Sequence, residues 1–300
     1  MLGTVASALE QGFLYCFMVL GVYITFRVLD FPDLTVDGSL TLGASVAAVL
    51  IVSDTSPFLA TLAGAGAGAA AGVVTAVLHM VLRADAADTN YAPKLISGIL
   101  TATALYTVNL RVMNRSNVPL LGEVTFFDRL GDIVGIQMWR WPLVVALLVI
   151  ALVVKYIIDW LLHTDLGLSM RALGDNEQMI RSLGANTNLT RLIGLAVSNA
   201  LVGLTGALVA QQQGYTDIGM SVGVLVAGLA GVILGEAIFG TRSVSWVLFS
   251  VIGGSIVYRL LIAFGLRVEW IRPTDLKLLT AVFVMVALAA PSIRRKVLKT

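Results

Sequence analysis

The stretch Leu143-Val-Val-Ala-Leu-Leu-Val-Ile-Ala-Leu-Val-Val154 contains no polar side chain and lies inside an apolar block that runs from 141 to 162. A helix of about 20 apolar residues crosses the roughly 30 Å hydrocarbon core of a bilayer. The block does not alternate apolar with polar residues, as the strands of a membrane barrel do. It therefore predicts a membrane-spanning helix.

Similar blocks recur along the 300 residues, of which 58% are hydrophobic and 13% charged. An ordinary soluble domain has about 25% charged residues. The opening residues lack the basic start and the cleavage site of a secretory signal, so the first block is expected to remain as a span. We predict an all-α, polytopic membrane helix bundle of eight or nine spans, forming one transmembrane domain over 1–300. The blocks are 8–28, 39–53, 57–82, 95–112, 141–162, 191–211, 221–240, 244–264 and 275–291.

The region 29–54 interrupts this pattern with the segment Asp30-Phe-Pro-Asp-Leu-Thr-Val-Asp-Gly-Ser39. Proline and glycine break a helix, and the freed backbone groups need water or protein around them. The block that follows Ser39 is short for a full crossing, so we expect a discontinuous or re-entrant segment. Two interpretations are open: an aqueous loop, or a broken helix that lines a polar path. The candidate path residues here are Asp33, Thr35, Asp37 and Ser39.

The distribution of basic residues predicts the orientation. Because successive loops alternate between the two sides, counting back from the C-terminus places the tail, the turn at Arg242 and the loops 163–190 and 83–94 on one side. Together with Arg191 they hold ten Lys or Arg, whereas the opposite loops, 113–140, 212–220 and 265–274, hold six with the adjoining Lys277. Lys and Arg accumulate in cytoplasmic loops. We therefore expect the first set, and with it the C-terminus, on the cytoplasmic side, and the side of the N-terminus stays open.

The sequence offers no arrangement of residues for enzymatic chemistry, so we expect no catalytic residues. His79, His163 and the single cysteine, Cys16, have no neighbours at ligand spacing, and no metal site is expected. No P-loop motif occurs, so the chain is not expected to hydrolyse a nucleotide by that route. The net charge of +2 gives no indication of a nucleic-acid surface.

Several spans carry polar or small residues that either pack helices together or serve transport. Gly64, Gly68 and Gly72 fall on one helix face, where they allow close packing within the chain or between two copies. Glu236, near a span end, is either structural or part of a gate. Arg27 and Arg259, also near span ends, are expected to reach the headgroups, with contact to the solute as the alternative. Within 95–112 the residues Thr103, Tyr106 and Asn109 are predicted to fall near one helical face, which makes them further candidates for the path. Helix-to-helix hydrogen bonding is the alternative, and it also applies to Ser198, Asn199 and Gln211–Gln213.

The loop 163–190 has the pattern of a compact element with short helices. Asp175 or Asn176 is placed to cap a helix that runs through Leu183 and ends at Gly184. A second helical piece is expected from Leu168 to Leu173. From the residues alone, an inert connector and a docking site for a soluble partner are both open.

Three segments together resemble ABC permeases of the branched-chain amino acid and ribose importer superfamily. They are Asp33-Leu-Thr-Val-Asp-Gly-Ser39, then Arg171-Ala-Leu-Gly-Asp-Asn176 followed by Gly184-Ala-Asn186, and Gly228-Leu-Ala-Gly-Val-Ile-Leu-Gly-Glu-Ala-Ile-Phe-Gly240. The stretch Phe26-Arg-Val-Leu-Asp-Phe-Pro-Asp-Leu-Thr-Val-Asp-Gly38 is most similar to permeases of the tryptophan/tyrosine type. The family signature Glu-Ala-Ala-x-x-x-Gly is matched only at its glycine, in Gln178-Met-Ile-Arg-Ser-Leu-Gly184.

The resemblance implies a permease of the type II importer architecture in a bacterial cytoplasmic membrane, carrying a small solute such as an aromatic or branched-chain amino acid by alternating access. It also implies a cytoplasmic ABC ATPase that binds ATP and Mg, a second permease copy and an extracytoplasmic binding protein, with no cofactor in this chain. The loop 163–190 would then couple to the ATPase. The implied coupling residues are Leu168, Met170, Arg171, Ala172, Leu173, Gly174, Asp175, Asn176, Gly184, Ala185 and Asn186.

A stand-alone, ion-coupled secondary transporter is the alternative. Glu236 inside a span and the broken helix at 30–38 would suit it, because such carriers bind substrate at discontinuous helices. The loop motif and the lack of two similar halves in the sequence count against it.

Overall fold

The computed structural model describes residues 2–84, 92–135 and 141–265, with three further helical positions at 278, 282 and 285. Within these residues, seven helices are long and apolar enough to cross a membrane, and Val224–Phe239 is a shorter apolar helix. The predicted all-α, polytopic bundle is confirmed. The predicted span 275–291 lies outside the described residues.

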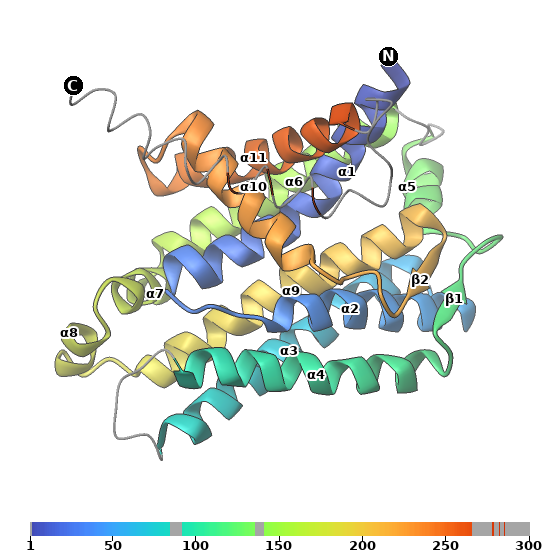
Figure 1. Cartoon of the computed structure of the whole chain (residues 1–300). Coiled ribbons are helices and arrows are strands. Elements are labelled where there is room, and N and C mark those ends of the chain that lie inside the picture. The colour runs from blue at the N-terminus through green and yellow to red at the C-terminus, as the bar shows by residue number, and fades with distance from the viewer. Residues whose placement is uncertain are drawn as a thin grey trace. The chain divides into compact units, whose positions relative to one another are not determined.

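The chain divides into two compact units, which we call the larger and the smaller unit (Figure 1). The larger unit comprises Gly21–Met138 and Trp160–Val222, and the smaller unit comprises Met1–Leu20, Trp139–Asp159 and Gly223–Thr300. The prediction of one permease domain over 1–300 stays a prediction.

The larger unit is built around three helices that pack against one another: α2 (Thr35–Val52), α3 (Pro57–Ala84) and α9 (Thr187–Gln213). A fourth helix, α4 (Ala92–Met113), packs against α2 and α3. The strands β1 (Asn117–Pro119) and β2 (Tyr215–Asp217) form an antiparallel pair in which Val118 is opposite Thr216. This pair joins the chain that leaves α4 to the chain that leaves α9.

Shorter helices complete the larger unit. The π-helix η1 (Ile24–Val28) follows the end of α1, and α5 (Phe126–Val134) begins at a capping box formed by Thr125 and Asp128. Two short helices, α7 (Asp165–Asp175) and α8 (Glu177–Ser182), precede α9.

The smaller unit contains most of α1 (Leu2–Tyr23) and of α6 (Trp141–His163), together with α10 (Val224–Phe239) and α11 (Val244–Gly265). Helices α10 and α11 pack closely because glycines face each other. A Cβ atom on Gly254 would lie 2.0 Å from the carbonyl oxygen of Gly231. The hydroxyl of Ser255 on α11 donates a hydrogen bond of 2.9 Å to the Gly12 carbonyl of α1.

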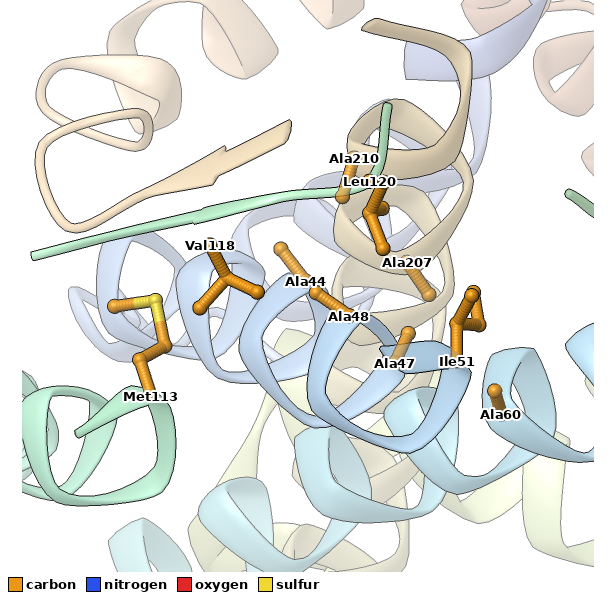
Figure 2. Close-up of a cluster of buried hydrophobic side chains, with 10 residues drawn as sticks. All are labelled: Ala44, Ala47, Ala48, Ile51, Ala60, Met113, Val118, Leu120, Ala207 and Ala210. Atoms are coloured by element: carbon orange, nitrogen blue, oxygen red, sulfur yellow. The ribbon is translucent and has the colours of Figure 1, made fainter. Parts of the chain in front are cut away.

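The close packing of the larger unit depends on small side chains (Figure 2). A Cβ atom on Gly68 of α3 would lie 2.2 Å from the Asn199 carbonyl oxygen, and one on Gly72 would lie 2.2 Å from that of Leu195. The glycines of the small-residue tract therefore pack against α9 of the same chain, which is the first of the two predicted alternatives. A neighbouring alanine-rich core comprises Ala44, Ala47, Ala48, Ile51, Ala60, Met113, Val118, Leu120, Ala207 and Ala210.

The structure corrects the sequence prediction for 39–53. Helix α2 begins at Thr35 rather than Ser39, and its 18 residues make it one of the seven helices long enough to cross a membrane. The prediction of a segment too short for a crossing is therefore wrong. The interruption is confined to 29–34, where Asp30 has a positive φ of 47° and Pro32 has no amide proton. Asp37 lies in the first turn of α2, where its negative charge stabilises the N-terminus of the helix.

Candidate functional site

The interruption between η1 and α2 brings Asp33 into the packed interior of the larger unit. The Asp33 carboxylate is fully buried and accepts two hydrogen bonds, one of 2.9 Å from the Thr35 amide and one of 2.7 Å from the Asn199 side chain on α9. The Asn199 oxygen in turn accepts a hydrogen bond of 2.6 Å from the hydroxyl of Ser39. Three of the predicted path residues thus meet around Asn199, which the sequence identified only as a polar residue of a span.

The environment of Asp33 is polar but not cationic. Thr35 also contacts the Thr75 hydroxyl of α3 at 2.7 Å. Burial raises the pKa of the Asp33 carboxyl, although the hydrogen bonds from Thr35 and Asn199 oppose this rise. Among the described residues, no Lys, Arg or His lies within ion-pairing distance of Asp33. We call Asp33, Thr35, Ser39, Thr75 and Asn199 the Asn199 network.

The loop between α6 and α9 folds as the two short helices that the sequence predicted. The Asn176 side chain accepts a hydrogen bond of 2.9 Å from the Met179 amide and caps α8. Gly184 has a φ of 84° and follows the end of α8. The Thr164 side chain caps α7, and the Asn186 side chain caps α9. These caps explain why so short a loop has a defined shape.

The coupling residues named from the sequence fall into two groups. Met170 and Leu173 are buried, and Gly174 lies so close to η1 that a Cβ atom would be 2.1 Å from the Val28 carbonyl oxygen. These three residues fix the loop to the rest of the larger unit. The residues Leu168, Asp175, Asn176, Gly184 and Asn186 are exposed, and Arg171, Ala172 and Ala185 are partly exposed.

An ion-pair cluster holds α8 in place, and the sequence analysis did not select it. Glu177 binds Arg83, at the end of α3, and its other oxygen accepts a hydrogen bond of 3.0 Å from Arg191 on α9. The side chain of Arg191 is only 2% exposed. Burial by itself would raise the pKa of the Glu177 carboxyl, but the hydrogen bonds and charges of Arg83 and Arg191 outweigh it, and the pKa is lowered. We call these three residues the Glu177 clamp.

A second contact joins the segment before α2 to the start of α4. The Lys94 ammonium donates a hydrogen bond of 2.8 Å to the Asp30 carbonyl and lies 3.7 Å from the Asp30 carboxylate. The neighbouring residue, Phe31, packs edge-on against His79 of α3, with the two ring centres 5.2 Å apart. The interrupted segment is therefore fastened to both α3 and α4, which a free aqueous loop would not be.

Comparison with known proteins decides the family. Residues 4–289 match the family described as the permease component of branched-chain amino acid transport systems. The chain belongs to this family of ABC transporter permeases. The relationship predicted from the sequence is confirmed.

Two relatives match this permease over almost its whole length. It is 37% identical to the tyrosine transport system permease protein of Clostridioides difficile (strain R20291), over 99% of this chain and 94% of that protein. It is 33% identical to an uncharacterised protein of Rickettsia prowazekii (strain Madrid E), over 95% and 96% of the two chains. A more distant relative, the ribose import permease protein RbsC of Escherichia coli (strain K12), is 27% identical over 68% of this chain and 60% of its own length.

A solved structure supports the fold. An ABC transporter assigned to the metal-chelate type, in an inward-facing conformation, matches with a TM-score of 0.52 and 15% identity, over 97% of this chain and 85% of that chain. At this identity the similarity concerns the fold alone.

The remaining path candidates do not gather in one place on the permease. Asn109 of α4 is buried and donates a hydrogen bond of 3.2 Å to the Gly38 carbonyl, whereas Thr103 is exposed and Tyr106 is 54% exposed. The predicted common face of these three residues is therefore wrong, because six helical positions place Asn109 about 120° from Thr103. Asp37 is partly exposed on α2, with interactions of its own.

Two further ionisable groups lie in the smaller unit. Glu236 is partly exposed in the last turn of α10, and its role stays a prediction. Lys155, which the sequence analysis did not select, is fully buried in α6, where its ammonium lies 2.7 Å from both Asp159 and Ser245. It also lies 4.2 Å from the centre of the Phe249 ring. A lysine and an aspartate four residues apart within an apolar span are the signal that could have indicated this pair.

Proposed function

We propose that this permease is the membrane-spanning subunit of an ATP-driven importer in a bacterial cytoplasmic membrane, with its C-terminus in the cytoplasm. Its solute is a small molecule, an amino acid of the aromatic or branched-chain type. A cytoplasmic ABC ATPase would bind ATP and Mg and drive alternating access. A second copy of the chain and an extracytoplasmic binding protein complete the assembly.

The observation that carries this proposal is the surface of α7 and α8. Leu168, Met179 and Leu183 are 50%, 51% and 74% exposed, although they lie outside the helices long enough to span a membrane. Large apolar side chains that stay exposed along one segment of a chain, outside its membrane spans, are typical of a protein-binding surface. In a permease of the ABC family, the partner expected at such a surface is the ATPase.

The Glu177 clamp supports a coupling role for this surface. Because Glu177 binds the end of α3 and the start of α9 at once, a displacement of α8 is transmitted to both helices. The same two helices provide Thr75 and Asn199 to the network around Asp33. Movement of the ATPase would thus reach the candidate path residues through α3 and α9.

The amino-acid solute rests on the relatives. The Clostridioides difficile relative is a tyrosine transport system permease, and its similarity covers nearly the whole chain. We extend this substrate class to the present permease. Asp33, Thr35, Asp37, Ser39, Thr103, Tyr106 and Asn109 remain candidates for the path, and Glu236 remains a candidate for gating.

Purification from the native host tests the proposal. We expect a P-loop ATPase to co-purify in near-equal amount with the tagged permease in mild detergent, and to be identified by mass spectrometry. The double variant Met179→Asp/Leu183→Asp should lose it, because two charges would enter the apolar contact. Leu121→Asp is the matched control, since Leu121 is 90% exposed outside the α7–α8 surface. A permease that purifies alone and accumulates amino acids from an ion gradient without ATP would instead be a secondary transporter.

A further inference from the structure

Arg259 is a charged residue within the span α11, and among the described residues it has one weak hydrogen-bond partner. Its guanidinium carbon lies 3.6 Å from the centre of the Tyr15 ring on α1 and 6.0 Å from that of Tyr258. One nitrogen makes a long contact of 3.4 Å with the Gln11 side-chain oxygen, and the buried Nε atom has no partner in the part of the chain that the structure describes. The sequence predicted that this side chain extends toward the headgroups at the end of its own span. In the structure it instead contacts α1.

Among the described residues, the guanidinium has more N–H donors than it has acceptors. Stacking on Tyr15 occupies one face of the planar group, whereas its N–H donors lie in the plane. No carboxylate of the described residues lies within ion-pairing distance of Arg259. A buried donor without a partner is a cost that a bound acceptor would remove.

The surroundings of Arg259 are unsuited to lipid. Thr4, Ser7, Gln11 and Tyr15 follow one another at spacings of three or four residues along α1, and all four are at least partly exposed. They form a polar stripe on one face of the helix. Charged and polar side chains within a span face a water-filled path or a protein partner, because exposure to hydrocarbon is unfavourable. This face of the smaller unit is therefore not a lipid-facing surface.

We propose that Arg259, held by Tyr15 and Gln11, binds the carboxylate of the solute during its passage through the permease. A guanidinium can hold a carboxylate through two parallel hydrogen bonds, which an ammonium cannot reproduce. The proposal rests on the amino-acid importer described above and adds to it the group that recognises the acid function common to all amino acids.

Uptake and ATP hydrolysis measured on the same proteoliposomes test this site. The vesicles contain the permease with its co-purified ATPase and binding protein, and the probe is a mixture of radiolabelled L-amino acids. Arg259→Met keeps much of the contact with Tyr15 but removes the charge. We expect amino-acid uptake to fall about ten- to a hundredfold, as for loss of charge-assisted hydrogen bonds, with ATP hydrolysis within about twofold of wild type.

Two further variants sharpen the test. Arg259→Lys should retain intermediate uptake, because the charge remains but the paired donors are lost. Arg115→Ala is the control, since Arg115 is exposed in the larger unit and should leave uptake unchanged.

Several results would overturn the inference. Uptake by Arg259→Met close to wild type excludes a solute contact, and a parallel loss of uptake, ATP hydrolysis and complex yield indicates a structural role. If wild-type uptake is higher in vesicles that contain phosphatidylglycerol than in vesicles of phosphatidylcholine alone, and Arg259→Met shows no such difference, the anion bound is a lipid headgroup. If wild type itself shows no ATP-dependent uptake of any amino acid, the proposed function fails and the inference with it.

Discussion

At the scale of single residues, the permease contains a buried polar network whose members come from distant parts of the chain. The sequence selected Asp33, Thr35 and Ser39 because they interrupt an apolar run, and noted Asn199 as polar within a span. The sequence could not predict which of these residues bind one another. Asp33 and Asn199 are separated by 166 positions, and they meet only because α9 packs beside the start of α2. Periodicity gave the wrong result for Asn109, where the direction of each side chain around α4 decides its surroundings.

Removing the amide of Asn199 should destabilise the larger unit. Asn199→Ala would leave the Asp33 carboxylate and the Ser39 hydroxyl buried with fewer partners, at a cost of about 1–3 kcal/mol. Thermal unfolding of the purified permease in detergent should show a lower midpoint. Thr103→Ala is the control, since an exposed threonine contributes within about 0.5 kcal/mol. Equal midpoints for the two variants would mean that the Asn199 network contributes nothing to stability.

At the scale of helices, the sequence predicted the spans well and their contacts only in part. Apolar blocks determine where a helix lies in a membrane, so most of the predicted spans agree with the described helices. The start of α2 was missed, because the helix begins only three residues after Pro32 and includes Asp37 and Gly38 in its first turn. The small-residue tract was recognised as a packing face, and the structure identifies α9 as its partner.

Two glycines on α3 provide a matched test of this packing. Gly68→Ala would place a Cβ atom 2.2 Å from the Asn199 carbonyl oxygen, so α3 and α9 must separate, whereas a Cβ atom on Gly66 has nothing within 4 Å. We expect Gly68→Ala to lower stability by about 1–3 kcal/mol, and Gly66→Ala to be neutral or stabilising by up to about 1 kcal/mol. Thermal unfolding would measure both. Similar losses for both variants would contradict close packing at Gly68.

The Glu177 clamp predicts how α8 responds to pH. The pKa of Glu177 in the folded protein is below its ordinary value of about 4.3, so its contribution to stability is fully present above that pH and is lost as the pH falls through the lowered pKa. A spin label at Ser182→Cys, on exposed α8, should become more mobile only in this acidic range. The single native cysteine, Cys16, is buried and should not react. In a Glu177→Gln background the label should be mobile at every pH. A pH-dependent transition that persists in this background would exclude Glu177 as its origin.

At the scale of the whole molecule, structure and charge distribution give two independent indications of topology. The Glu177 clamp joins Arg83, at the end of α3, to α8 and to the start of α9. The loops 83–94 and 163–190 therefore lie on the same side of the larger unit. The pairing of β1 with β2 brings together the chain ends that leave α4 and α9 at the opposite ends of those helices. The sequence grouped these loops in the same way from alternation alone. The structure gives the grouping, and the excess of Lys and Arg predicts which group is cytoplasmic.

Reporter fusions test the absolute orientation. Green fluorescent protein fused after Thr300 should fluoresce, and alkaline phosphatase at the same position should be inactive, because the side with ten Lys or Arg is predicted to be cytoplasmic. Alkaline phosphatase inserted at Gly122, in the connection between β1 and α5, should be active, because this loop is predicted on the opposite side. The reverse pattern at both positions would place α7 and α8 outside the cell. No cytoplasmic ATPase could then reach the apolar surface of Leu168, Met179 and Leu183, and the proposed coupling role would fail with the orientation.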